Sequence, residues 1–238
     1  MSLRLLTVGV RLLLVGAVIV VVGAAAASCD IPPQAGGAPT AGGGTFETGA
    51  TPVGAGLIVS EGHGWRGSQV LGPLPAPGAC HFGSTGTGGN ETGPAIPDRA
   101  CTPGAVDEAV TEANLRQTLC RKGGYTDSVR PPREVTDTFK TVARKAYSAP
   151  GRSSDYELDH LIPLGLGGSS DSRNLWPELN VGDPGQFDRS NPYGNNAKDG
   201  VESRLHTAVC SGEVGLVAAQ EAIATNWLTA LTRLGVSP

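Results

Sequence analysis

Three polar side chains are spaced in this sequence like the parts of a hydrolytic metal site. Asp159 and His160 are adjacent inside the apolar stretch YELDHLIPLGLGG, and Asn174 follows His160 by 14 residues. Because neighbouring residues of a strand point to opposite faces, the carboxylate can hold a divalent ion while the imidazole deprotonates a water molecule beside it. The amide of Asn174 can orient this histidine or supply a ligand oxygen.

A second set of candidate ligands comes from a helix that we predict over residues 198–210. Its core-facing residues are expected to be Val201, Leu205, Ala208 and Val209. Glu202 and His206 are four residues apart, so they stack on one face of this helix. Packed over the strand, the helix would bring His206 to Asp159 as a second metal ligand. Glu202 is the alternative ligand, and it is otherwise expected to pair with Lys198.

Hydrophobic periodicity predicts the elements that position these residues. The stretch Tyr156 to Leu166 predicts a strand, which a tight turn at Gly167-Gly168 reverses into a return strand. Further helices are expected over residues 136–148 and 213–234. The predicted fold class is therefore α+β, mostly helical, with one small β-hairpin.

Composition divides the chain into three parts. Residues 1–29 combine a basic start, a short apolar run and a small-residue end at Cys29, which predicts a secretory signal. Residues 30–100 are rich in Gly, Ala and Pro and predict a flexible linker, with a short strand near GLIVS. The folded domain is expected over residues 101–238, which is long enough for one core.

The signal leaves three forms of the protein open. The stretch AASC resembles a bacterial lipobox, which would be cut before Cys29 so that a lipid on this cysteine tethers the chain to the membrane. Cleavage after the alanines would secrete the chain, and an uncleaved signal would anchor it. All three forms export the protein from a bacterial cytoplasm.

Cysteine usage agrees with export, because exported proteins keep disulfides. If Cys29 carries lipid, four cysteines remain, and they allow three pairings. Of these we favour Cys80–Cys101 together with Cys120–Cys210. The sequence has no CxxC and no Cys/His cluster at zinc spacing, so we expect structural disulfides rather than a metal or redox site.

The net charge of −4 excludes a chain that is basic throughout, so any nucleic-acid contact must be local. Residues 121–152 hold eight basic against three acidic side chains, and Arg130, Lys140 and Arg144 in this segment are candidate phosphate contacts. Residues 153–238 are acidic instead, with five basic and eleven acidic side chains.

The central stretch YELDHLIPLGLGGSSDSRNLWPE resembles the HNH endonuclease motif in its D-H-x-x-P, its double glycine and its N-L. The flanks TLCRKGGYTDSVRPP and KDGVESRLHTAVCSG resemble exported bacterial proteins related to HNH nucleases. The resemblance covers about Cys101 to Trp227 and implies a ββα-metal core.

Carried onto this chain, the resemblance implies that His160 is the general base and Asp159 a metal ligand. Asn174 corresponds to the middle Asn of the motif, which either orients the base or joins the metal. His206 is the match for the final His, as metal ligand or phosphate contact. It follows Asn174 by 32 residues, farther than HNH proteins usually place it, which leaves Glu202 as its substitute.

The function expected from these features is metal-dependent hydrolysis of DNA, or of RNA, outside the cytoplasm with low sequence specificity. The cofactor would be one divalent ion, Mg²⁺ ahead of Mn²⁺, Ni²⁺ or Zn²⁺, and no protein partner is predicted. The rival is a lipid-tethered extracytoplasmic binding protein with a degenerate HNH-like site. The acidity of residues 153–238 motivates this rival.

Overall fold

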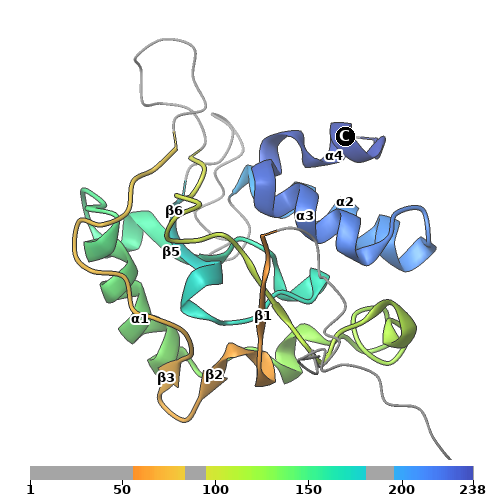
Figure 1. Ribbon diagram of the computed structural model, residues 1–238, viewed down its shortest axis with the longest axis horizontal. Helices are drawn as coiled ribbons and strands as arrows, with labels where there is room; N and C mark the ends of the chain where they lie inside the picture. Colours follow the sequence, from red (N-terminus) through yellow and green to blue (C-terminus); the bar gives the residue numbers. More distant parts are fainter. Residues whose placement is uncertain (1–55, 84–94, 181–195, 238) are drawn as a thin grey trace, which may run out of the picture. The chain divides into compact units, whose positions relative to one another are not determined.

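The protein alternates short strands with helices whose apolar residues recur every three or four positions. A computed structural model describes residues 56–83, 95–180 and 196–237, all within the compact unit Gly49–Pro238 (Figure 1). Its strands are β1 (Ile58–Ser60), β2 (Trp65–Arg66), β3 (Gln69–Val70), β4 (Ala105–Asp107), β5 (Tyr156–His160) and β6 (Leu175–Leu179). Its α-helices are α1 (Arg133–Ala146), α2 (Ala197–Ser211), α3 (Leu216–Asn226) and α4 (Ala230–Leu234). Its 3₁₀ helices are η1 (Gly62–Gly64), η2 (Glu112–Asn114), η3 (Thr126–Ser128), η4 (Ser153–Asp155), η5 (Leu164–Leu166), η6 (Ser172–Asn174) and η7 (Trp227–Thr229).

The strands form three two-stranded sheets, so the α+β class is confirmed. The expectation of one hairpin is incomplete. β5 and β6 pair antiparallel as predicted, with Tyr156 opposite Leu179 and His160 opposite Leu175. Two further sheets were not predicted: β1 pairs with β4 in parallel, and β2 pairs with β3 antiparallel. These strands are two or three residues long, too short to show an alternating pattern.

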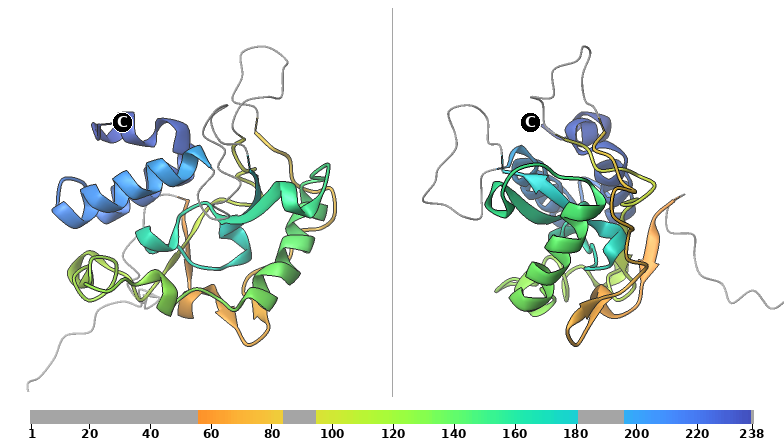
Figure 2. Two further views of the ribbon diagram at one scale, coloured as in Figure 1. Left: turned by 180° about the vertical axis from the view of Figure 1, so that it is seen from behind. Right: turned by 90° about the vertical axis from the view of Figure 1, so that its left-hand side faces the viewer.

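Helix α1 covers one side of the hairpin, and α2 to α4 lie on the other (Figures 1 and 2). Pro131 and Pro132 hold the chain extended, and the helix begins directly after them. The buried side chains of α1 are Val135, Phe139, Ala143 and Ala146. α2 buries Leu205, Ala208 and Val209 as predicted, and Gly212 ends it in the left-handed conformation at φ 79°.

Two predicted elements differ from the structure. The tight turn at Gly167-Gly168 is wrong, because residues 161–174 separate the two strands and contain η5 and η6. The leucines and isoleucine of this segment enter the core instead of continuing the strand. The single helix over 213–234 is also wrong. It breaks at Asn226, whose extended backbone frees its side chain to accept a hydrogen bond from the Leu228 amide.

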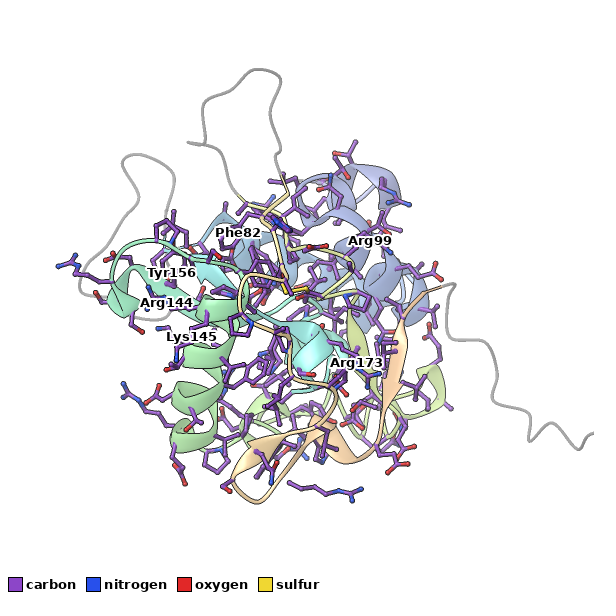
Figure 3. All side chains as sticks on the ribbon, turned by 60° about the vertical axis from the view of Figure 1, so that its left-hand side comes forward. Phe82, Arg99, Arg144, Lys145, Tyr156 and Arg173 are labelled. Atoms are coloured by element: carbon purple, nitrogen blue, oxygen red, sulfur yellow. A yellow bond between two sulfur atoms is a disulfide. The ribbon has the colours of Figure 1, made fainter. Side chains whose placement is uncertain are left out.

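The expected linker ends earlier than residue 100. Residues 56–83 and 95–100 are part of the folded unit, and the strand predicted near GLIVS is β1. The ring of Phe82, labelled in Figure 3, packs 4.9 Å from that of Tyr147. The Ser170 amide donates to the His63 carbonyl at 2.7 Å. Backbone hydrogen bonds and a disulfide thus order a segment whose composition alone predicts disorder.

Two disulfides brace the fold, and both are the pairs that we favoured. Cys80–Cys101 spans 21 residues and Cys120–Cys210 spans 90. Disulfides indicate a protein that folds outside the reducing cytoplasm. Residues 1–29, including Cys29, lie outside the described residues. Within the described ranges, none of the helices combines the length and the apolar character needed to cross a membrane.

Replacing both cysteines of Cys120–Cys210 by Ala should lower the free energy of unfolding more than the same change at Cys80–Cys101. The longer loop restricts the unfolded chain more, by about 4.5 against about 3 kcal/mol in the loop-entropy model. Urea denaturation of the two double variants measures the difference. The reverse order would show that strain or packing at the bonds, rather than loop length, sets their contribution.

Candidate functional site

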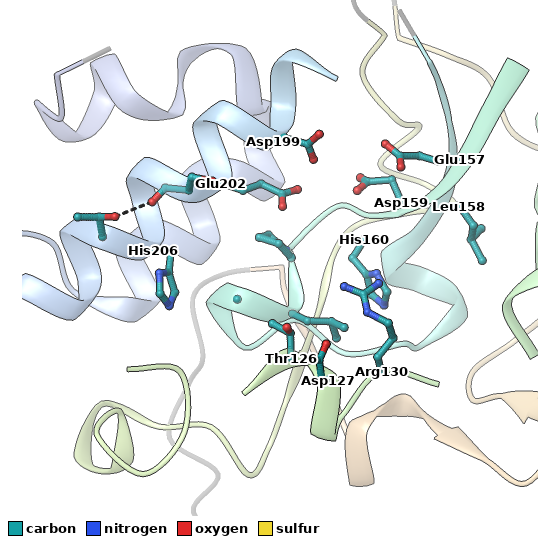
Figure 4. Close-up of a pocket in the computed structure, with 15 residues that line it drawn as sticks. Thr126, Asp127, Arg130, Glu157, Leu158, Asp159, His160, Asp199, Glu202 and His206 are labelled. Atoms are coloured by element: carbon teal, nitrogen blue, oxygen red, sulfur yellow. Dashed lines mark hydrogen bonds between the residues drawn. The ribbon is translucent and has the colours of Figure 1, made fainter. Parts of the chain in front are cut away.

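Strand β5, helix α2 and the turn at η3 enclose a cavity of about 730 Å³ (Figure 4). β5 contributes residues 157–160, and α2 contributes five side chains between residues 199 and 207. The third wall holds Thr126, Asp127 and Arg130. The cavity therefore collects side chains from segments that are far apart in the sequence.

Asp159 is held in one orientation by two donors on the same oxygen. Trp176 Nε1 donates to Oδ2 at 2.7 Å, and Lys198 Nζ lies 2.8 Å from that oxygen. Among the described residues, no donor contacts the other oxygen, Oδ1. The side chain is 13% exposed, so the carboxylate is fixed in place with one oxygen available to a ligand.

His160 leaves the opposite face of β5 and is a neutral imidazole. Its Nε2 lies 2.9 Å from the Ser170 hydroxyl. Burial, followed by the positive charges of Arg130 and Lys198, lowers the pKa of His160 from 6.5 to about 3. The ring is therefore unprotonated at physiological pH and has a nitrogen free to accept a proton.

Glu157 and Glu178 join Asp159 in an acidic cluster. The strand register places Glu157 directly opposite Glu178, and Glu157 shares a strand face with Asp159 because they are two residues apart. Oxygen atoms from these three carboxyls all lie within 4.8 Å of one another. Asp199 and Glu202 approach the cluster from α2 (Figure 4).

Crowding of these carboxyls disfavours their ionised forms. Burial, and then the charges of Asp159 and Asp199, raises the pKa of Glu157 from 4.5 to about 7. Burial also raises the pKa of Glu202 to about 7 and that of Glu178 well above its usual value. Without an added cation, the cluster therefore retains protons near neutral pH.

Lys198 is the positive group inside this cluster. Its side chain is fully buried, and Nζ contacts carboxylate oxygens of Asp159 and Glu202 and donates to the His160 carbonyl at 2.9 Å. Burial alone would lower the pKa of Lys198, but the neighbouring carboxylates, Asp159 first, raise it overall. The pairing of Lys198 with Glu202 was expected from their spacing; its contact with Asp159 was not.

Asn196 is a member of the site that sequence reasoning missed. It precedes the first residue of α2, is 8% exposed, and its Nδ2 donates to a carboxylate oxygen of Glu157. Its Oδ1 is buried and faces the Asp199 amide of α2 as in a capping box, but it accepts no hydrogen bond of normal geometry among the described residues. A buried carbonyl oxygen without a donor is costly unless something positive meets it. Its position at a helix N-terminus facing the strand was the signal available in the sequence.

These residues fit a hard divalent ion. The donors that lie together are the carboxylate oxygens of Glu157, Asp159 and Glu178, and Asn196 borders them through its hydrogen bond to Glu157. Such a set suits Mg²⁺, Mn²⁺ or Ca²⁺ better than Zn²⁺ or Ni²⁺, which favour nitrogen and sulfur ligands.

Asn174 has a different position from the one predicted. Its Oδ1 accepts from the amides of Ile162 and Ala105, and its Nδ2 donates to the carbonyls of Ile162 and Ser169. It is fully buried and does not line the cavity. These hydrogen bonds all go to backbone groups of the β5–β6 connection and of Ala105 in β4. None goes to the His160 ring or to a carboxyl of the cluster among the described residues, so the roles in orienting the base or binding the metal stay predictions.

His206 lines the cavity but is not brought to Asp159. Its Nε2 lies 3.1 Å from the Leu119 carbonyl and 3.6 Å from Cys210 Sγ. Figure 4 shows its ring turned toward the wall that carries Thr126. One helical turn separates it from Glu202, which reaches the cluster through Lys198. The predicted ligand role of His206 is corrected accordingly.

Of the three candidate phosphate contacts, one lines the cavity and two do not. Arg130 is exposed and lines the cavity close enough to influence His160. Lys140 and Arg144 lie on α1 and do not line it. Arg144 donates to the Gly151 carbonyl at 2.8 Å, and its guanidinium lies 5.3 Å from the centre of the Tyr156 ring. Arg144 therefore stabilises the end of α1.

Comparison of the chain with protein families, with characterised proteins and with solved structures finds no match.

Glu157→Gln should stabilise the metal-free protein increasingly as pH rises. The folded state holds a proton on Glu157 up to about pH 7, whereas the unfolded state releases it near 4.5, so the wild type loses stability across this window. Urea denaturation in chelator should give a difference that grows to about 1–3 kcal/mol by neutral pH. Glu134→Gln, at an exposed site on α1, is the control. A difference that does not change with pH would contradict the raised pKa.

Asn174→Ala should destabilise the fold without changing metal affinity. It leaves four buried backbone groups without partners, a loss of roughly 3–5 kcal/mol. Urea denaturation measures the stability, and Mn²⁺ titration below the unfolding transition measures the affinity. A variant of normal stability that no longer binds Mn²⁺ would restore Asn174 to the ligand set.

Proposed function

We propose that this protein is an exported, metal-dependent endonuclease with an HNH-type, ββα-metal site. The observation that carries the proposal is the end of β5. There two adjacent residues line one cavity, Asp159 within a cluster of oxygen donors and His160 as a neutral imidazole. Hydrolysis of a phosphodiester needs these two functions side by side.

The metal ligands in this proposal are Asp159 Oδ1, Glu157, Glu178 and Asn196 Oδ1. When bound there, a divalent ion would polarise the scissile phosphate and stabilise the leaving oxygen. The ligand set replaces the pair of Asp159 with His206 or Asn174 that the sequence suggested. Its hard oxygens favour Mg²⁺ or Mn²⁺.

His160 is the general base of the proposed reaction. In the proposed tautomer Nε2 carries the proton and donates to the Ser170 hydroxyl, so Nδ1 takes a proton from the attacking water. Burial is the main cause of the lowered pKa of His160, and the charges of Arg130 and Lys198 add to it; a phosphate near the imidazole would offset these charges and raise the pKa. Ser170 therefore sets the orientation of the base.

Arg130 is the proposed phosphate contact. It is exposed at the rim of the cavity, on the wall opposite α2, and its guanidinium can hold a phosphate oxygen in two hydrogen bonds. A backbone contact of this kind carries no base information, which agrees with low sequence specificity. DNA, or RNA, is the proposed substrate.

The proposed cellular setting follows from the N-terminal residues. Residues 1–29 would direct export. Cys29 would carry lipid at a lipobox, remain near the new N-terminus after cleavage behind the alanines, or belong to an uncleaved anchor, so that the protein is a membrane-tethered or a secreted nuclease. The two disulfides support this setting.

The full chain, expressed with export so that both disulfides form, should nick plasmid DNA in Mg²⁺ or Mn²⁺ and stop in chelator. His160→Ala and Asp159→Ala should each reduce nicking by about 10²-fold or more, since one removes the base and the other a metal ligand. Gel electrophoresis of the plasmid measures the rate.

His81→Ala and Asp137→Ala, which change exposed residues outside the cavity, are the matched controls and should nick at the wild-type rate. An oxidised, folded chain that binds DNA in chelator and never cuts it would favour the rival binding protein. Cleavage that persists in His160→Ala would reject the assigned base.

A further inference from the structure

Lys198 uses all of its donors inside the acidic cluster. Its three N–H groups meet the Asp159 carboxylate at 2.8 Å, the Glu202 carboxylate, and the His160 carbonyl at 2.9 Å. Its side chain is 0% exposed. Neither a phosphate nor a water molecule can therefore reach this ammonium, which rules out a role as proton donor or substrate contact.

The contacts of Lys198 divide the cluster into two halves. The half that contains the ammonium consists of Asp159 Oδ2, Glu202 and the His160 carbonyl. The other half consists of Glu157, Glu178 and Asn196, and among the described residues no positive group forms an ion pair with its two carboxyls. Asp159 belongs to both halves, because one of its oxygens lies within 4.8 Å of oxygens of both glutamates.

We propose that Lys198 takes the place of a second metal ion, so that the cluster binds one divalent cation, and that it positions Asp159 and His160 for the reaction. This inference rests on the metal site of the proposed function. The Lys198 half has the composition of an ion site, with two carboxylates and a backbone carbonyl around a positive charge. The ammonium fills it permanently.

A second ion is excluded by charge and by space. An ion bound to Asp159 Oδ2 would have to occupy the volume of an ammonium that already lies 2.8 Å from that oxygen. Two positive charges at such a separation repel strongly in a buried site. The open half lacks this obstacle, so the divalent ion is directed to Glu157, Glu178 and Asn196.

The same contacts make Lys198 a positioning residue. Its bond to Asp159 Oδ2 leaves Oδ1 without a donor among the described residues, and its bond to the His160 carbonyl fixes the end of the strand that carries the base. Because Lys198 is the second residue of α2, it also sets how this helix docks on β5.

The test counts Mn²⁺ ions bound to the full chain by isothermal titration and by electron paramagnetic resonance. The wild type should bind one ion. Lys198→Met, which keeps the unbranched apolar stem but removes the ammonium at its end, should bind two, and Mn²⁺ should raise its melting temperature by about twice the wild-type shift. Lys145→Met, at an exposed position on α1, is the control and should bind one ion.

The double variant Lys198→Met with Glu202→Gln should return to one ion, because the vacated half has then lost a carboxylate. Lys198→Gln serves as a second variant if Lys198→Met does not fold, since its amide can still donate to the His160 carbonyl. If neither variant folds even with Mn²⁺, the proposal is overturned, because an ion that replaced the ammonium would restore the fold.

Different results of the Mn²⁺ titration would overturn the proposed metal site and the proposed role of Lys198. A wild type that binds no Mn²⁺ removes the metal site of the proposed function. A wild type that binds one ion while folded Lys198→Met also binds one, or a wild type that binds two, overturns the role of Lys198 and leaves the nuclease proposal standing.

Discussion

Five carboxyl groups meet a single buried ammonium between β5 and α2, and this imbalance of charge is the constraint on which the site depends. Glu157 and Glu178 stand directly opposite each other on the hairpin, where like charges destabilise a sheet. Lys198 offsets part of the repulsion through Asp159 and Glu202. In the metal-free protein, protons retained on the glutamates remove the rest of this repulsion. A bound cation would offset it in their place.

The β5–β6 hairpin keeps this arrangement because hydrogen bonds and close packing hold its long connection, residues 161–174, in place. The amide of Asn174 satisfies backbone groups from three separate segments, and Gly168 lies so close to the Ile162 carbonyl that a Cβ there would be 1.7 Å from its oxygen. Cys120–Cys210 joins the segment leading to η3 to the end of α2, so two walls of the cavity are covalently linked. The geometry of β5 therefore depends on residues that take no part in the chemistry.

Alternation along β5 gives neighbouring residues opposite tasks. Asp159 faces the carboxyl cluster, and His160 faces Ser170 and the side of Arg130. Burial favours the neutral form of the glutamates beside Asp159 and of His160, raising the pKa of Glu157 and lowering that of the histidine. In the proposed function, one desolvated cavity would therefore provide both the cation-binding carboxyls and the unprotonated base.

Local pattern was sufficient for part of this protein. The apolar and branched character of the stretch from Tyr156 predicted a strand, in which Asp159 and His160 point to opposite faces. The spacing in α2 predicted the burial of Leu205, Ala208 and Val209, whereas Val201 is only half-buried. The even set of cysteines predicted disulfides, and the favoured pairing of three is the one found. These features depend on near neighbours or on covalent chemistry. Composition was misleading for residues 56–83, because its few apolar side chains are ordered by partners elsewhere in the chain.

The tertiary structure alone decided the membership of the site. Strand register placed Glu178 against Glu157. The docking of α2 brought Asn196 to Glu157 and Lys198 to Asp159, while directing His206 to the Leu119 carbonyl. Residue types and spacing cannot specify these contacts, because the angle and depth at which a helix packs depend on the summed packing of distant segments. The sequence determined which groups could do the chemistry, and long-range packing decided which of them meet.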